Sequence, residues 1–128
     1  MSEKITVEII SPDKSVIKTQ AIEAVIPSYE GEMGILKDHI PLITFLRPGL
    51  IKIINEDQKD FFVEDGTVEF SENNLLILTS TAKELSEINK NTLDVLLNQA
   101  EKKYNTPDIS DKEKYLLFYK IETLESII

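Results

Sequence analysis

The spacing of apolar residues changes once along this chain, and that change constrains the fold more than any other feature. In the first part, apolar and polar residues alternate in short runs, such as the one that contains Ile5 and Val7. A period of two is typical of β-strands with one buried face. From residue 87 onward, residues such as Leu93 and Leu97 recur at the spacing of an amphipathic helix instead. We therefore expect a mainly β fold with a C-terminal α part.

The β part consists of short runs separated by turn signals, with strands at roughly 8–12-residue spacing. This arrangement favours an antiparallel β-sandwich, or a barrel. We place the sandwich domain at residues 1–86. Asp65-Gly66 is a good hairpin signal, because both residues accept the backbone conformations of a tight turn. The predicted turns are 11–14, 47–49, 55–58, 64–66 and 72–74.

The remaining residues, 87–128, predict two helices joined by a short loop. Asn89 is a good N-cap for the first helix, and Pro107 ends it. Ser110, with Glu113 three residues later, forms a capping-box pattern for the second. Two such helices form an antiparallel αα-hairpin. Each has only about four turns and is marginal alone, so the hairpin must pack against itself or against the β domain.

Aromatic residues on the second helix indicate a further contact surface. Leu117, Ile121 and Leu124 share one face of this helix, which we expect to close the hairpin core. The cluster of Tyr115, Phe118 and Tyr119 is less easily hidden on that face. We therefore expect these aromatic side chains to contact something else.

Composition excludes several classes of function. The formal net charge is −9, which argues against nucleic acid as a partner and against adsorption to anionic lipid. The chain has no cysteine, hence no disulfide and no thiolate nucleophile. No apolar run approaches the roughly 20 residues of a membrane span, so we expect no direct membrane insertion. The N-terminus lacks the pattern of a signal peptide, and the chain reads as cytosolic.

The segment 27–42 holds most of the candidate catalytic, metal-binding and docking residues. It contains two glycines, which predict a backbone bend, and the carboxylates of Glu30 and Glu32. These carboxylates are either a solvated edge or a docking site for a basic or amide-bearing loop. The only histidine, His39, lacks the further His or Cys ligands of a zinc site, and no nucleophile motif surrounds Ser28. We expect a turn histidine that bonds to backbone, with no catalytic residue, metal site or cofactor; a small hydrolase that uses His39 is a further hypothesis.

The pattern Pro-x-x-Glu-Gly-x-x-Gly-Ile-Leu-x-x-His-x-Pro-Leu of this segment resembles a hallmark of the epsilon subunit of the rotary F-type ATP synthase. The resemblance extends to 48–51, 76–82 and Ile88-Asn89. It implies a ten-stranded β-sandwich with a helical hairpin in the central rotor stalk, where a non-catalytic subunit couples the proton-driven c-ring to γ and the catalytic head for ATP synthesis. It also implies a peripheral position on the cytoplasmic face of the bacterial inner membrane.

The resemblance also implies partners and contact residues. The partners are the γ subunit, the c-ring and, through the hairpin, the catalytic α/β subunits. In many bacteria the hairpin of this family extends along γ and blocks ATP hydrolysis. The implied contacts are Glu30, Gly31, Glu32 and Met33 with the c-ring, and His39, Leu42 and Ile43 with γ.

Two departures from the family pattern carry predictions. Lys37-Asp38 stands where the family usually has Pro-Gly, so Asp38 must make a tight turn, at some cost if its φ is positive. The residues 109–114 lack the Asp-x-x-Arg-Ala motif of the members that bind ATP. We therefore expect no ATP binding and only weak regulation of hydrolysis by the hairpin. The alternative function is a free-standing β-sandwich interaction module with a dimerising helical hairpin.

Overall fold

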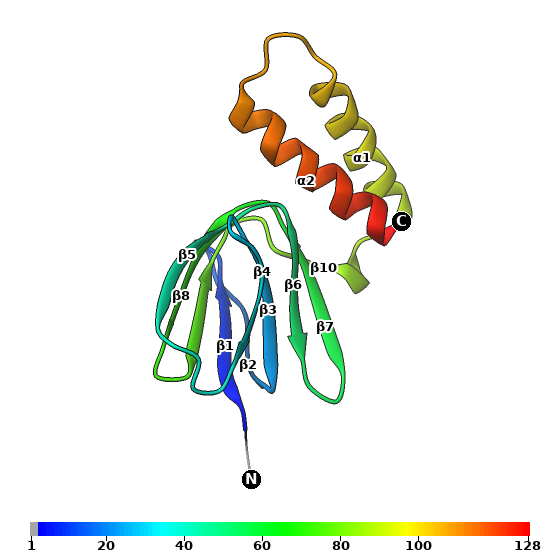
Figure 1. Cartoon of the computed structure of the whole chain (residues 1–128). Helices are drawn as coiled ribbons and strands as arrows, with labels where there is room; N and C mark the ends of the chain where they lie inside the picture. Colours follow the sequence, from blue (N-terminus) through cyan, green and yellow to red (C-terminus); the bar gives the residue numbers. More distant parts are fainter. Residues whose placement is uncertain (1–2) are drawn as a thin grey trace.

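The computed structural model describes residues 3–128, so the first two residues of the predicted sandwich lie outside the described residues. The described chain forms a β-sandwich with a pair of helices folded against one end of it, and strand β1 begins at the opposite end (Figure 1). The strands are β1 (Ile5–Ile10), β2 (Ser15–Ala21), β3 (Glu23–Ser28), β4 (Gly31–Leu36), β5 (Leu42–Leu46), β6 (Gly49–Ile54), β7 (Gln58–Val63), β8 (Gly66–Ser71), β9 (Asn74–Leu78) and β10 (Lys83–Glu84). The helices are the 3₁₀ turn η1 (Leu85–Glu87), α1 (Lys90–Tyr104) and α2 (Asp111–Ile127). Within residues 3–128, no helix is long and apolar enough to cross a membrane.

The strands form two layers that meet along one edge of β3. Hydrogen-bonded neighbours follow the order β10-β7-β6-β3-β5-β8-β9-β1-β2, and β4 pairs with the other edge of β3. The first residues of β3 pair with β6, whereas Ser28 at its end pairs with Leu46 of β5. One edge of β3 therefore passes from the first layer to the second, which confirms the predicted β-sandwich. The pairing is antiparallel except between β1 and β9, which run parallel.

A single apolar core fills the space between the layers. Ile5, Val7 and Ile9 are fully buried in it, and the residues between them on β1 are partly exposed. Phe61 of β7 and Phe70 of β8 enter the same core from the two layers. The period of two along the strands therefore identified the buried face correctly.

The predicted hairpin at Asp65-Gly66 is wrong. Strand β7 pairs with β6 and β10, whereas β8 pairs with β5 and β9, so the chain crosses between the layers at this point. Gly66 has a φ of 150°, and a Cβ on it would lie 2.7 Å from the carbonyl oxygen of Leu78. Local turn chemistry favours a reversal here, but the burial of each strand's apolar face decides its partner. The turn at Glu72-Asn73 does join paired strands, with φ values of 49° and 62°.

The two helices begin at the predicted caps. The Asn89 side chain accepts a hydrogen bond of 2.8 Å from the backbone N–H of Thr92 at the start of α1. At the start of α2, the Ser110 hydroxyl accepts one of 3.1 Å from the N–H of Glu113. Each bond satisfies a donor that the helix itself leaves free. The helices lie side by side as an αα-hairpin (Figure 1).

A second apolar cluster joins this hairpin to the sandwich. Its buried members are Phe62 of β7, Leu93 of α1 and Leu124 of α2. Phe61 and Phe62 are consecutive on β7, so they point to opposite faces of the sheet. Phe61 therefore belongs to the sandwich core, and Phe62 belongs to the interface with the hairpin.

Candidate functional site

The β3–β4 turn carries the first group of candidate residues. Tyr29 and Glu30 form the turn, and Ser28 closes it: its hydroxyl donates to the carbonyl of Gly31 at 2.7 Å and accepts from the N–H of Glu30 at 3.2 Å. Gly31 has a φ of 120°, with no atom within 4 Å of the place a Cβ would take. Glycine is therefore needed here for its backbone conformation and not for space.

Beyond the turn, the predicted bent loop is a regular strand, β4. Glu32 is exposed, and Met33 turns inward to pack on the sandwich core. Gly34 makes no bend; a Cβ there would lie 2.6 Å from a carboxylate oxygen of Glu23 on β3. Of the residues that the sequence implied as c-ring contacts, Glu30 and Glu32 thus present their side chains to solvent.

The second group follows β4 at its other end. Asp38 has a φ of 67°, the left-handed conformation that glycine adopts without strain. The backbone N–H of Asp38 donates to the Asn73 side chain at 2.7 Å, and the amide of Asn73 donates back to the Asp38 carboxylate at 3.3 Å. This reciprocal pair holds the turn that the family pattern makes with Pro-Gly.

His39 makes contacts within the chain. Its Nδ1 lies 2.7 Å from the carbonyl oxygen of Ile40, and its ring meets Phe70 edge-on at a centroid distance of 5.9 Å. It therefore bonds to backbone, as predicted for a turn histidine. Within residues 3–128, no group of three or more His, Cys, Asp or Glu side chains could hold a metal ion.

The outer surface of β5 and its surroundings is apolar. Ile43 is 77% exposed and Ile40 is 74% exposed, whereas Leu42 is partly buried against the core. Phe45 of β5 and Leu78 of β9 also expose their side chains. Both residues pair with Thr67 of β8, the strand that lies between β5 and β9. We call Ile40, Ile43, Phe45 and Leu78 the β5 face. Exposed apolar side chains gathered on neighbouring strands in this way often mark a contact with another protein.

Sequence reasoning found Ile43 but missed Ile40, Phe45 and Leu78. A signal for β5 was present: four of the five residues in 42–46 are apolar, so both faces of this strand carry apolar side chains. One face enters the core and the other requires a separate cover. The pattern alone does not distinguish which face is buried, and therefore does not separate Leu42 from Ile43.

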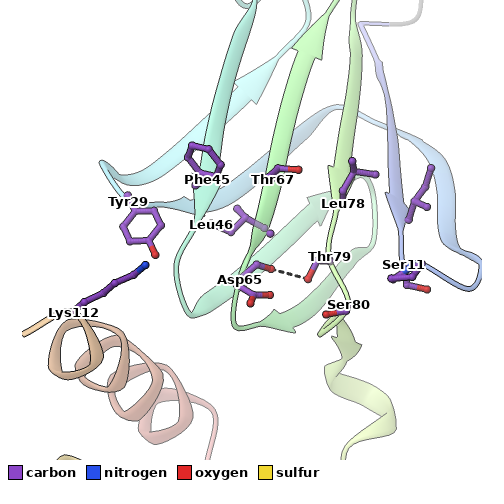
Figure 2. Close-up of a pocket in the computed structure, with 13 residues that line it drawn as sticks. Ser11, Tyr29, Phe45, Leu46, Asp65, Thr67, Leu78, Thr79, Ser80 and Lys112 are labelled. Atoms are coloured by element: carbon purple, nitrogen blue, oxygen red, sulfur yellow. Dashed lines mark hydrogen bonds between the residues drawn. The ribbon is translucent and has the colours of Figure 1, made fainter. Parts of the chain in front are cut away.

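An open cleft of about 1070 Å³ separates this face from the start of α2. Figure 2 shows Phe45 and Leu78 on the sandwich side, and Lys112 reaching from α2 toward Tyr29. At its floor, the hydroxyl of Thr79 donates to the carbonyl of Asp65 at 2.7 Å (Figure 2). This bond holds the end of β9 against the crossover between the layers.

Side chains of α2 contact the sandwich on the other side of this cleft. The rings of Tyr115 and Tyr29 stack at a centroid distance of 5.7 Å, and the Arg47 guanidinium lies 3.9 Å from the centre of the Tyr119 ring. Lys120 forms an ion pair of 2.8 Å with Glu64. The expected second contact surface is thus confirmed for Tyr115 and Tyr119.

A two-layer β-sandwich with a helical hairpin folded against its end defines the class of protein. The family model for the β-sandwich domain of the ATP synthase delta/epsilon chain matches residues 4–85. The chain belongs to this family, which confirms the resemblance seen in the sequence.

Relatives and solved structures agree with this assignment. The chain is 47% identical over 129 residues to the ATP synthase epsilon chain of Pelagibacter ubique, covering 99% of each chain. It is 34% identical to that of Nostoc punctiforme, over 85% of this chain and 82% of the relative. Its fold is similar to a chain of the Euglena gracilis mitochondrial ATP synthase structure with OSCP, F1 and c-ring: the TM-score is 0.80 and the identity 23%, over 98% of this chain and 82% of that chain. A chain of the central stalk and c-ring structure from Tetrahymena thermophila gives a TM-score of 0.68 at 17% identity, over 98% and 96%.

Proposed function

We propose that this chain is the epsilon subunit of a bacterial F-type ATP synthase. In this role it is a non-catalytic part of the central stalk that couples the proton-driven c-ring to γ and the catalytic head. The observation that carries the proposal is the 47% identity to an ATP synthase epsilon chain over 99% of both chains. The subunit would lie at the cytoplasmic face of the inner membrane as a peripheral component. Its two working units are the sandwich, 1–86, and the hairpin, 87–128.

We further propose that two separate surfaces of the sandwich bind the two rotor partners. The β5 face, with the adjoining His39 turn, binds γ, because its apolar side chains lack a cover within the described chain. The β3–β4 turn and the start of β4 bind the c-ring through Glu30 and Glu32, whose exposed carboxylates suit a polar or basic loop. These surfaces start from opposite ends of β4, which suits a subunit placed between two partners. The hairpin is the part that meets the α/β subunits.

Affinity purification of the tagged full-length chain from its source cell tests this function. We expect γ and the catalytic α/β subunits to be recovered with it, because a stalk subunit contacts γ throughout the rotary cycle. Cells that carry the tag alone serve as the control. Recovery as a lone monomer or homodimer, without these subunits, would contradict the proposal and favour the free-standing interaction module.

We propose that the hairpin of this subunit does not bind ATP. The start of α2 lacks the Arg-Ala motif, and Ser110 and Glu113 already bond to each other there through the helix cap. Glu113 also lies 4.0 Å from Lys103 of α1. In a calorimetric titration of the full chain, we expect no binding heat from ATP at micromolar concentrations. Micromolar or tighter affinity that is lost in Lys112→Ala would refute this expectation, since Lys112 is the cation nearest the helix start.

A further inference from the structure

A continuous aromatic stack connects α2 to the sandwich at two points. Tyr115 and Tyr119 are one helical turn apart on α2 and meet edge-to-face at a centroid distance of 4.9 Å. The Tyr115 ring lies parallel to that of Tyr29, with an interplanar angle of 8°. The guanidinium of Arg47, the residue after β5, lies over the face of the Tyr119 ring in a cation–π contact. Both ends of the stack therefore belong to the sandwich and its centre belongs to the hairpin.

The stack ends on the turn that carries Glu30. The Tyr115 hydroxyl also donates a hydrogen bond of 3.2 Å to the carbonyl oxygen of Tyr29. The remaining support of this turn comes from Ser28 and from the N–H of Tyr29, which donates to the carbonyl of Phe45 at 3.1 Å. Tyr115 is therefore the contact by which α2 reaches both the ring and the backbone of the turn.

The second arm of the stack holds the strand beside the turn. The backbone N–H of Arg47 donates to the carbonyl of Pro27 at 2.9 Å, so the residue under Tyr119 is bonded to the end of β3. Arg47, Tyr119 and Glu32 line one small cavity of about 300 Å³ between α2 and the sandwich. Tyr115 of α2 thus contacts Tyr29, the residue before Glu30, and Tyr119 of α2 lines the same cavity as Glu32.

We propose that the folded hairpin is a positioning element for the β3–β4 turn: Tyr115 of α2 holds the turn in the shape that presents Glu30 and Glu32 to the c-ring. This inference rests on the proposed function, and adds to it a link between the hairpin and the c-ring contact. Because such coupling is reciprocal, a turn bound to the c-ring favours the folded hairpin by the same factor. Release of the hairpin in turn loosens the c-ring contact.

The link can be cut without releasing the hairpin. Other contacts hold α2 in place, namely the ion pair of Lys120 with Glu64 and the apolar cluster around Phe62 and Leu124. A Tyr115→Ala substitution removes the ring stacking and the hydrogen bond to the turn but leaves these contacts. Phe118 is an aromatic control on the same helix: 48% of its surface is exposed, and its ring meets Tyr119 edge-on at a centroid distance of 5.2 Å. The contacts with Tyr29 come from Tyr115 instead.

Amide hydrogen exchange on the full chain gives the first test. In Tyr115→Ala, we expect the amides of Tyr29 and Glu30 to exchange about tenfold faster, since an aromatic pair and a hydrogen bond each typically contribute a few-fold. Exchange within α2 is expected to stay slow, and Phe118→Ala is expected to leave the turn unchanged. Unchanged exchange at the turn in Tyr115→Ala would overturn the proposal, as would equal acceleration in both variants.

Binding to the detergent-solubilised rotor of γ and c-ring gives the second test. Tyr115→Ala is expected to bind severalfold more weakly, with Phe118→Ala unchanged. Wild-type affinity of Tyr115→Ala, together with a loosened turn, would overturn the link to the c-ring. Glu32→Lys separates this result from the proposed function: if it also binds like wild type, the c-ring contact itself is wrong, whatever the exchange data show.

Discussion

Replacing Phe62 with alanine is expected to release the helical hairpin from a β-sandwich that stays folded. Phe62 is 1% exposed and is the sandwich's fully buried contribution to the cluster with Leu93 and Leu124. Buried Phe→Ala changes cost about 3–5 kcal/mol, and two short helices are marginal without packing. The substitution therefore removes the fully buried sandwich side chain on which Leu93 and Leu124 pack, whereas the sandwich core does not contain this side chain.

Phe61→Ala is the matched control one residue away. Phe61 is 2% exposed and lies in the core between the layers, so its loss is expected to destabilise the whole protein by about 3–5 kcal/mol. Amide exchange combined with denaturant unfolding distinguishes the two variants. We expect Phe62→Ala to lose protection in residues 90–127 and keep it in the strands, and Phe61→Ala to lose both together. Identical exchange patterns in the two variants would contradict the division into separate cores.

The run Phe61-Phe62-Val63 shows what the sequence could predict about the hairpin. Consecutive apolar residues on a strand indicate that both faces are covered, and the helical spacing after residue 87 predicts helices with an apolar stripe. The sequence left open whether the hairpin packs on itself or on the sandwich. In the structure the two helices pack on each other and on the sandwich, because Leu93 of α1, Leu124 of α2 and Phe62 of β7 form one cluster. Which surfaces meet depends on three-dimensional positions that local spacing does not encode.

Turn chemistry predicted where the chain reverses but not which strands pair. Asp65-Gly66 and Glu72-Asn73 both carry turn-forming residues, yet only the second joins neighbouring strands. The parallel pairing of β1 with β9 joins segments more than sixty residues apart, such as Val7 with Leu75. Pairing at this separation follows from burial of whole faces, so a local pattern cannot reveal it.

The candidate site divides in the same way. The motif placed Glu30, Glu32 and His39 in one segment, and the structure separates them to opposite ends of β4 because that segment is a strand. The departure at Asp38 was visible in the sequence as a turn without glycine. The hydrogen bond that supports this turn was not visible in the sequence, because Asn73, which accepts it, lies thirty-five residues away. Only the family resemblance assigned partners to these positions, since exposed carboxylates and an exposed apolar face do not by themselves identify the protein that binds them.

Ile43→Lys is expected to weaken association with γ by about 30-fold or more, the effect of losing a contact worth about 2 kcal/mol at the centre of an interface. Ile43 is the most exposed large apolar residue of the β5 face, and an ammonium group there would be buried without a partner in the complex. In the free chain the new lysine would lie opposite Glu69 on β8, a favourable cross-strand pair. The variant should therefore fold normally.

Titration of purified γ with the full chain, followed by fluorescence anisotropy, measures this effect. Val95→Lys is the matched control, because Val95 is an exposed apolar residue on α1 outside the β5 face. Leu42→Ala gives the opposite signature: Leu42 packs on the core, so its loss lowers the free energy of unfolding and leaves γ affinity nearly unchanged at temperatures where the variant is folded. Wild-type affinity in Ile43→Lys would exclude the β5 face as the γ surface. Loss of γ affinity only in Leu42→Ala would indicate instead that γ binds residues whose side chains point toward the sandwich core.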